Sequence, residues 1–225
     1  MNKIQELFTQ KEDFGNKPIT PIDQGWMQRK LNTQEMEYLW KCIDNKSKKD
    51  YRIKLAGNIS NSYVLSDRGD WFWHNTINPL IGDYEKYFWA IAPNINLRDN
   101  NRKHPLYLHQ WWVNYQKQTE FNPLHTHSGV YSFVIWMKIP TNYKQQSKLD
   151  IARSSNSEYI SNFTFSYTTM MGQVTDYTYE MNSDMEGTML LFPSKLNHQV
   201  YPFYNCDEDR ISISGNIKLN TAKLL

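Results

Sequence analysis

The feature that most restricts the fold of this chain is a series of short strand-like stretches that begins after Pro93 and continues to the C-terminus. Residues 162–169, for example, alternate Phe163, Phe165 and Tyr167 with polar neighbours, which is the pattern of a half-buried strand. Segments rich in Asn, Asp and Ser separate the stretches, as turns do. We predict a turn region at 170–176 and strands at 107–118, 131–139, 162–169, 177–181, 187–192, 199–203 and 210–219.

The composition agrees with a β-rich globular protein. Aromatic residues make up 15% of the chain, and this excess favours pleated sheets over helices. Hydrophobic residues make up 40%, which is enough for a sizeable core. A chain of 225 residues is commonly one domain when it is built from strands, so we expect a single domain over 1–225.

The first part of the chain has helical rather than strand-like patterns. Asn32 or Thr33 can cap a helix over about 33–47, and a second helical pattern over about 67–92 must break or kink at Pro79. Seven or more short strands behind a helical layer suggest a mainly β jelly roll with N-terminal α-helices packed on one sheet. The expected layout is an N-terminal arm at 1–30, a helical layer at 31–95 and a jelly-roll core at 105–220.

Charge, cysteine content and hydropathy exclude several classes of protein. The net charge of +2 gives no chain-wide field that would attract nucleic acid or an anionic membrane, and the basic run 46–54 is interpreted as a solvated helix end without a role. Cys42 and Cys206 have no metal-motif spacing and form no disulfide framework. The longest nearly apolar run, 130–137, is too short to span a bilayer. We therefore expect a cytoplasmic protein with neither nucleic acid nor membrane as a partner.

The densest chemical signal is the stretch from Glu120 to Gly129, which contains His125 and His127. Residues two apart in a strand share a face, so both imidazoles could reach one metal ion, although satisfied histidines are also common. A second signal is His198, which follows a buried-looking strand that ends at Pro193. An ordinary core strand with a polar corner is the alternative interpretation of that stretch.

A third signal is the alternation along 210–219. One face carries isoleucines at 211, 213 and 217, and the other carries Arg210, Ser212, Ser214 and Asn216. If the polar face lines an interior cavity, Arg210 needs an anion, because an unpaired buried charge costs several kcal/mol. A guanidinium binds a carboxylate through two parallel hydrogen bonds. The alternative is an exposed arginine on an edge strand, paired with Asp207 or Glu208.

Together, the NPxHxHSG, FPxxxxH and RxSIS stretches between about 111 and 217 resemble the iron(II) and 2-oxoglutarate-dependent oxygenase superfamily. The resemblance is greatest to the prolyl-hydroxylase-like members encoded by bacteria and tailed phages. It implies a double-stranded β-helix, Fe(II) as the cofactor, 2-oxoglutarate and O2 as cosubstrates, and succinate and CO2 as coproducts. If the chain is phage-encoded, its compartment is the host cytoplasm.

The resemblance also implies roles for particular residues. His125 matches the first metal ligand and His198 the distal ligand, while Arg210 and Ser212 match the pair that holds the far carboxylate of 2-oxoglutarate. Asn114 or Tyr115, just before the histidine loop, are additional candidate contacts to the cosubstrate. No catalytic residue is expected beyond the metal site.

His127 departs from the superfamily pattern, because most members carry an aspartate or glutamate there. Three protein ligands on one face of an octahedron leave three positions for cosubstrates. His127 is then the third ligand, or a carboxylate comes from elsewhere, or the site takes a different metal. In a last reading His127 is the first ligand and Gly129 stands at the carboxylate position, as in related halogenases. The candidate carboxylate donors are Asp150, Asp176 and Asp184.

The function expected from these residues is a dioxygenase that hydroxylates a protein side chain, such as proline, or a small molecule. One alternative is a jelly roll that binds metal or another ligand without turnover. Another is a cupin-type three-histidine dioxygenase, in which Arg210 would hold the substrate's own carboxylate. We expect substrate choice to lie in residues 141–160 and in the N-terminal helices.

Overall fold

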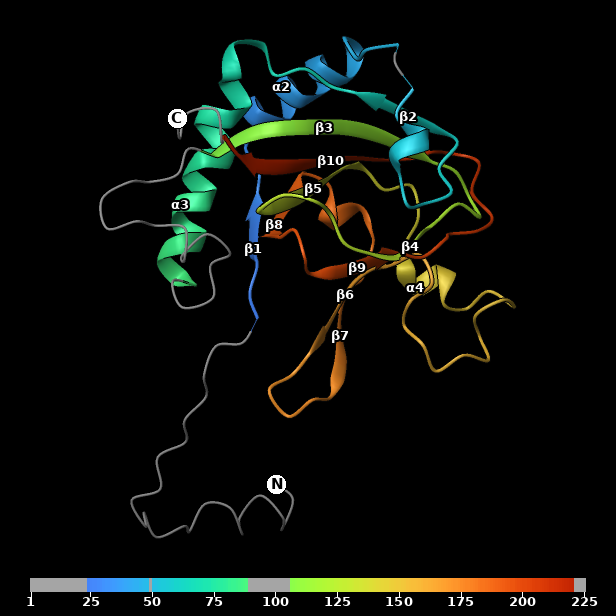
Figure 1. Cartoon of the computed structure of the whole chain (residues 1–225). Coiled ribbons are helices and arrows are strands. Elements are labelled where there is room, and N and C mark those ends of the chain that lie inside the picture. The colour runs from blue at the N-terminus through green and yellow to red at the C-terminus, as the bar shows by residue number, and fades with distance from the viewer. Residues whose placement is uncertain (1–23, 49, 89–105, 221–225) are drawn as a thin grey trace, which may run out of the picture.

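The computed structural model describes residues 24–48, 50–88 and 106–220, which form two antiparallel β-sheets (Figure 1). The six-stranded sheet has the order β1 (Met27–Lys30), β8 (Thr188–Pro193), β5 (Tyr131–Lys138), β10 (Arg210–Leu219), β3 (Leu106–Gln116) and β2 (Asn61–Val64). The four-stranded sheet has the order β4 (Asn122–His125), β9 (Asn197–Val200), β6 (Phe163–Thr168) and β7 (Val174–Tyr179).

The chain crosses between the two sheets in a regular way. From β3 onward, β3, β5, β8 and β10 lie in the large sheet, while β4, β6, β7 and β9 lie in the small one. All of the pairings are antiparallel. This winding of eight strands into two facing sheets is the double-stranded β-helix, and it confirms the predicted mainly β jelly roll.

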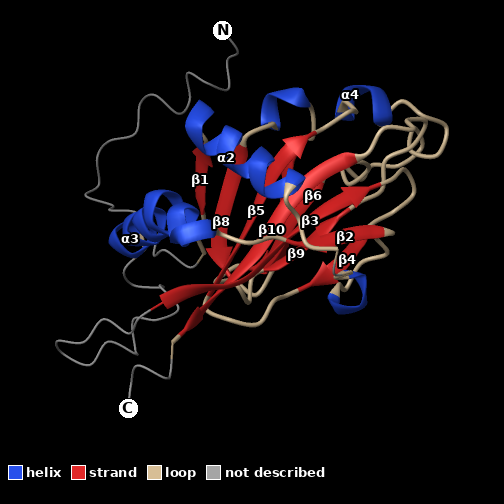
Figure 2. Cartoon of the chain, turned by 90° about the horizontal axis from the view of Figure 1, so that it is seen from above, coloured by secondary structure: helices blue, strands red, loops and turns tan. Residues whose placement is uncertain are grey.

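Helices cover the outer face of the large sheet (Figure 2). The two longer ones are α2 (Thr33–Asp44) and α3 (Asn78–Tyr87). Their apolar side chains, such as Leu39 and Ile81, share one core with Val113, Ile135 and Ile213 of the sheet. The shorter helical segments are η1 (Arg52–Lys54), η2 (Arg68–Asp70), η3 (Trp73–Ile77), α4 (Tyr143–Gln146) and η5 (Ser183–Met185). Among the described residues, no helix is both long and apolar enough to cross a membrane.

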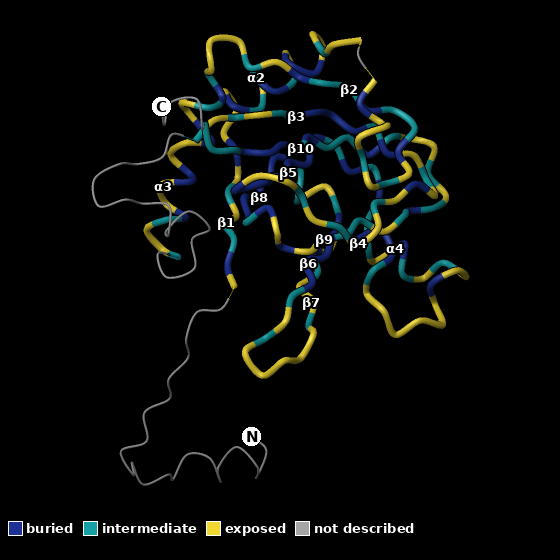
Figure 3. Tube along the Cα trace, viewed as in Figure 1, coloured by how far each residue is buried: buried dark blue, intermediate teal, exposed yellow. Residues whose placement is uncertain are grey.

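A second core fills the space between the two sheets. Val134 and Trp136 of β5 meet Phe163 and Phe165 of β6 there, together with Phe192 of β8. The strand β5 is therefore buried on both faces, whereas the hairpin of β6 and β7 has an exposed tip (Figure 3). The candidate site adjoins this core, because Phe163, Phe165 and Phe192 contact the ring of His198.

The predicted helices differ from the structure in their boundaries. The helix predicted to end at residue 47 ends at Asp44, because Asn45 caps it. The helical pattern at 67–92 is divided into η2, η3 and α3, and its last residues, 89–92, lie outside the described part of the chain. Pro79 lies at the start of α3, directly after the π-helical turn η3, so the helical path is irregular at the place where the proline lacks its N–H.

The predictions for strands also need correction. The predicted turn region at 170–176 is too long, because 174–176 already belong to β7 and pair with β6. The strand predicted at 199–203 lies at Asn197–Val200 instead. The strands β1 and β2, at the edges of the large sheet, were not predicted.

Candidate metal centre and cosubstrate cavity

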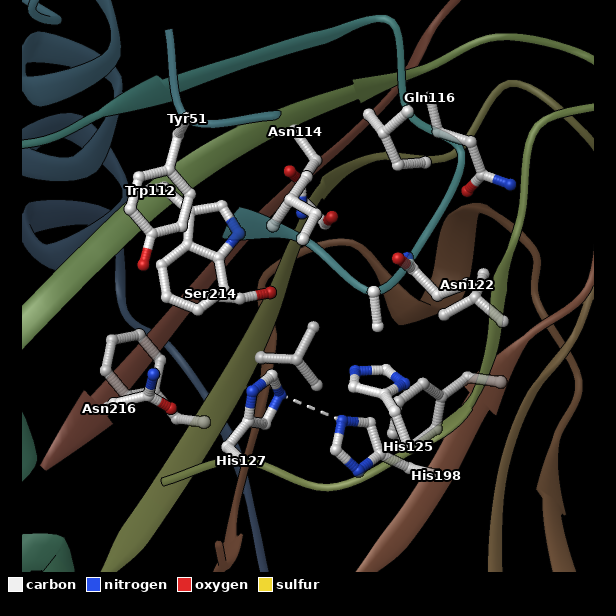
Figure 4. A pocket seen from close by; sticks show the side chains of 18 of the residues that line it. Tyr51, Trp112, Asn114, Gln116, Asn122, His125, His127, His198, Ser214 and Asn216 are labelled. Atoms are coloured by element: carbon white, nitrogen blue, oxygen red, sulfur yellow. Dashed lines mark hydrogen bonds between the residues drawn. The ribbon is translucent and has the colours of Figure 1, made fainter. Parts of the chain in front are cut away.

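Three histidines, from β4, from the loop after it and from β9, converge at one point (Figure 4). His125 ends β4, and its Cα lies opposite His198 of β9 in the pairing of the two strands. His127 follows in the loop after β4. One side-chain nitrogen from each histidine lies within 4.8 Å of the others. The fold thus brings together the three histidines that the sequence singled out.

Backbone carbonyl groups orient two of these rings. The Nδ1 atom of His125 lies 2.7 Å from the carbonyl oxygen of Pro123, and the Nδ1 atom of His198 lies 2.9 Å from that of Leu196. A carbonyl oxygen only accepts hydrogen bonds, so each Nδ1 must carry the proton. The Nε2 atoms then have a lone pair available for a metal ion, which is the usual arrangement in protein metal sites.

The backbone of the histidine loop is fixed by the stretch that follows β8. The N–H of His127 donates to the carbonyl oxygen of Ser194 at 2.8 Å, and the hydroxyl of Ser194 donates to that of Gly129 at 2.6 Å. Gly129 has φ = 115°, and a Cβ there would lie 2.6 Å from the carbonyl oxygen of Ile217. Only glycine fits this turn, which returns the chain from the loop into β5.

Burial keeps the three imidazoles neutral. It lowers the pKa of His125, lowers the pKa of His127 to about 4 and holds the pKa of His198 well below its ordinary value. The Nε2 atoms of His127 and His198 lie 3.1 Å apart. Two nitrogen ligands at right angles, each about 2.1 Å from an ion, would be about 3.0 Å apart. The spacing and the neutral state both fit a divalent metal ion.

A cavity of about 330 Å³ adjoins the histidines and lies between the two sheets. Among the described residues, no aspartate or glutamate lines it. The proposed carboxylate donors are occupied elsewhere: Asp150 pairs with Arg153 on the surface, and Asp176 accepts a hydrogen bond from Ser166. Asp184 lies in η5, which does not line the cavity either. Among the described residues, the candidate site therefore contains three histidines and no lining carboxylate.

Arg210 lies at the inner end of the cavity and is fully buried, at 1% exposure. Its NH2 group donates to the carbonyl and hydroxyl oxygens of Ser161, at 2.8 and 2.7 Å, and its guanidinium stacks on Phe203. Its Nε and NH1 atoms have no hydrogen-bond partner, and burial lowers its pKa to about 9. At neutral pH this is a buried cation with two unused donors, so an anionic ligand fits it.

Of the other residues predicted to contact the cosubstrate, two line the cavity and one does not. Ser212 and Asn114 both line the cavity, on directly paired positions of β10 and β3. The expectation for Tyr115 is corrected, because neighbouring strand residues point to opposite faces. Its ring contacts Tyr63 and the ammonium group of Lys46, on the face that packs beneath the helices. Tyr115 does not line the cavity.

The sequence did not reveal the outer wall of the cavity. Five residues of the stretch 51–59, among them Tyr51 and Lys54, line it together with Trp112 and Gln110 of β3. The basic run that ends at Lys54 therefore is not only a solvated helix end. None of residues 141–160, expected to carry substrate choice, lines the cavity. The position of 51–59 depends on contacts with residues distant in the sequence. The N–H of Asn58, for example, donates to the carbonyl oxygen of Phe121, the residue before β4.

The fold is a double-stranded β-helix, and its cavity contains three histidines that could hold a metal ion and a buried arginine with two unused donors. Residues 110–216, nearly half of the chain, match the family described as "Putative 2OG-Fe(II) oxygenase". The matched segment contains all three histidines and Arg210. The resemblance found in the sequence is therefore confirmed over this segment, which matches an iron(II)- and 2-oxoglutarate-dependent oxygenase family.

Solved structures similar to this chain include three prolyl hydroxylases. A prolyl-4-hydroxylase of Pseudomonas putida is 14% identical, with 88% of this chain and 94% of that chain covered and a TM-score of 0.45. The viral collagen prolyl hydroxylase of Paramecium bursaria Chlorella virus-1 is 11% identical, with 85% and 94% covered and a TM-score of 0.43. A prolyl hydroxylase of Trichoplax adhaerens is 13% identical, with 89% and 86% covered and a TM-score of 0.47. No curated protein matches this chain.

Proposed function

We propose that this oxygenase holds Fe(II) through the Nε2 atoms of His125, His127 and His198. The observation that carries the proposal is the convergence of the three histidines, whose ligand nitrogens lie within 4.8 Å of one another in a cavity without a lining carboxylate. Because two of the rings have their Nδ1 protons committed to backbone carbonyls, no rearrangement of the tautomers is needed for binding. His127 takes the position that a carboxylate occupies in most relatives.

Arg210 binds the far carboxylate of 2-oxoglutarate through its Nε and NH1 atoms. Ser161 holds the NH2 group from the other side, so the planar guanidinium presents its two remaining donors to the cavity in a fixed orientation. Ser212, the next cavity-facing residue of β10, and Asn114, paired with it on β3, are the additional contacts. The keto-acid end of the cosubstrate then points toward the histidines.

The reaction is the hydroxylation of a protein side chain, such as proline, or of a small molecule. Iron, once bound with 2-oxoglutarate and O2, supplies the oxidant that inserts one oxygen atom into a C–H bond as succinate and CO2 are released. The protein positions the cosubstrate between Arg210 and the histidines, and the aromatic residues Trp136 and Phe163 exclude water from the inner end of the cavity. The choice of proline rests on the sequence resemblance.

The experiment is a turnover assay on the purified protein with ferrous iron, 2-oxoglutarate and air. The expected result is succinate in a molar ratio of one to the 2-oxoglutarate consumed, abolished by a chelator and by Arg210→Met. Peptides that contain proline are then added, and mass spectrometry tests for the gain of one oxygen atom. Iron binding without any consumption of 2-oxoglutarate would contradict the proposal.

A second candidate is a three-histidine dioxygenase of the cupin type, which uses no 2-oxoglutarate. It is favoured by one observation, the absence of a carboxylate among the residues described around the cavity. In that case Arg210 would bind the carboxylate of the substrate itself. The two candidates differ in whether 2-oxoglutarate perturbs the metal site in the absence of any other ligand.

A further inference from the structure

The cavity wall formed by β3 and β10 consists of four successive pairs of side chains. In each pair one residue from β3 lies directly opposite one residue from β10, and all eight side chains line the cavity. The pairs are Gln116 with Arg210, Asn114 with Ser212, Trp112 with Ser214, and Gln110 with Asn216. Because the pairs follow one another at regular intervals from Arg210, they can be used to measure how far a bound ligand extends along the cavity.

The length of 2-oxoglutarate sets how many of these pairs it can occupy. Its four C–C bonds span about 5 Å, and a hydrogen bond to Arg210 adds about 3 Å. Consecutive pairs are about 7 Å apart, because two strand residues separate them. A cosubstrate that starts at Arg210 therefore reaches the second pair and ends short of the third. The third and fourth pairs, with Trp112 and Gln110, remain for another ligand.

The third pair contains an unused hydrogen-bond donor. Trp112 is 3% exposed, and its indole Nε1 has no hydrogen-bond partner. Trp112 lines the cavity, and its indole ring lies 6.1 Å from the ring of His127, between centroids (Figure 4). A buried N–H without a partner costs free energy, so an acceptor supplied by a ligand fits this position.

The neighbouring amides also present donors to this part of the cavity. The Oε1 atom of Gln110 accepts a hydrogen bond from the hydroxyl of Tyr51, and the Oδ1 atom of Asn216 accepts one from Ser132. Because each amide oxygen is already used, the NH2 group of each side chain is the part that can serve a ligand. Lys54 adds a cation at the exposed rim. Among the residues described, no carboxylate lines the cavity to balance a cationic ligand.

On this basis, and resting on the proposed function, we propose that Trp112 is a substrate-binding residue and that it recognises an oxygen acceptor. The substrate group that lies beside the metal centre carries carbonyl or carboxylate oxygens, as an acylated amino acid or a peptide backbone does. A group with a free ammonium fits this part of the cavity less well, because its described lining has a lysine at the rim and no carboxylate. Residues 51–59, across the cavity mouth, form the outer side of this subsite.

The test uses two probes that differ in one acetyl group. N-acetyl-L-proline methylamide has two amide carbonyls and no charge, whereas L-proline methylamide carries a protonated amine at neutral pH. Each is titrated by anaerobic calorimetry into the protein loaded with ferrous iron and 2-oxoglutarate. The acetylated probe is expected to bind more tightly. Trp112→Phe, which keeps the ring and removes the N–H, is expected to weaken its binding by about 3- to 10-fold.

Trp111→Phe is the matched control. Trp111 is the preceding residue of the same strand, is equally buried and packs against Phe72 beneath the helices, outside the cavity. Its variant should bind the acetylated probe as the wild type does. No binding of the acetylated probe, equal affinities for both probes, or equal losses in the two variants would overturn the assignment of Trp112.

Binding of 2-oxoglutarate is measured first in the same samples. Its absence in the wild type would overturn the proposed function and the substrate subsite with it. If 2-oxoglutarate binds normally and only the probe results fail, the substrate assignment alone is wrong. A loss of 2-oxoglutarate affinity in Trp112→Phe as large as the loss for the probe would show that the cosubstrate extends to the third pair, which also contradicts the proposal.

Discussion

The Nε2 atoms of His127 and His198 lie 3.1 Å apart, although the two residues are separated by 71 positions in the sequence. Both rings are neutral, because burial lowers the pKa of each. At this distance the two nitrogens either share one proton or direct two lone pairs at one ion. The backbone hydrogen bond at Nδ1 of His198 leaves its Nε2 without a proton, so the pair is prepared for a metal ion.

Replacing His127 tests its place in the metal centre. His127→Ala should weaken iron binding by about 100-fold or more, because even residues that only support a ligand contribute 10- to 100-fold. His127→Asp should retain iron, since it restores the carboxylate that most relatives carry. Metal content after dialysis measures both. His109→Ala is the control, because His109 is exposed and does not line the cavity. Full iron content in His127→Ala would remove His127 from the ligand set.

Replacing Arg210 should separate stability from cosubstrate binding. Without a ligand, Arg210 is a buried cation with two unused donors, so Arg210→Met should leave the melting temperature unchanged or raise it. Saturating 2-oxoglutarate at about 100 times its Kd contributes about 2.7 kcal/mol, which corresponds to about 5–10 °C for a protein of this size. That shift should occur in the iron-loaded wild type and disappear in Arg210→Met.

Thermal unfolding with and without 2-oxoglutarate measures both effects. Arg153→Met is a suitable control, because Arg153 is an exposed arginine paired with Asp150. Its variant should keep the full shift. A shift of wild-type size in Arg210→Met would mean that the carboxylate of the cosubstrate binds elsewhere.

The turn at Gly129 should tolerate no side chain. Gly129→Ala should lower the free energy of unfolding by about 2–3 kcal/mol, because it adds left-handed strain and a Cβ that lies 2.6 Å from a backbone oxygen. Gly172 also has a positive φ, 79°, but a Cβ there meets nothing within 4 Å. Gly172→Ala should therefore cost only the strain, about 1 kcal/mol. Urea unfolding compares the two, and equal costs would exclude the close contact as the cause.

A buried carboxylate holds the first helix in place. Glu35 is 2% exposed, and its side chain accepts hydrogen bonds from Arg29, Thr76 and the backbone N–H of Asn32. Glu35→Ala should cost about 2–3 kcal/mol, because it removes the capping box and leaves the hydroxyl of Thr76 without its acceptor. Glu37→Ala, at an exposed position of the same helix, should change stability by less than about 0.5 kcal/mol. Chemical denaturation measures both variants, and a similar cost in each would contradict this role of Glu35.

The parts of the fold that could be predicted are those in which one strand face is apolar. The alternation along β10 predicted that its isoleucines pack beneath the helices and that its polar residues line the cavity, and both predictions are confirmed. The start of β7 was predicted as a turn. In the structure Val174 is exposed there and its neighbours are polar, so this part of the strand has no apolar face. That strand is specified by its pairing with β6, which local sequence does not encode.

In the candidate site, too, residues that lie in local sequence motifs could be predicted, whereas residues placed by long-range contacts could not. The histidines and Arg210 lie in compact motifs, so the sequence could point to them. The subsite around Trp112 could not be found, because its second wall comes from residues 51–59, which are distant in the sequence and reach the cavity only through contacts such as that between Asn58 and Phe121. Tyr115 was chosen from the correct strand, but strand register decides which of two neighbouring residues faces the cavity.

The most direct test of the central claim is an anaerobic titration of 2-oxoglutarate into the ferrous protein, followed by visible absorption. The weak metal-to-ligand charge-transfer band should appear in the wild type and be lost in His127→Ala and in Arg210→Met at the same concentration of cosubstrate. Iron binding by the wild type without this band would contradict the account, and it would favour a three-histidine site that does not use 2-oxoglutarate.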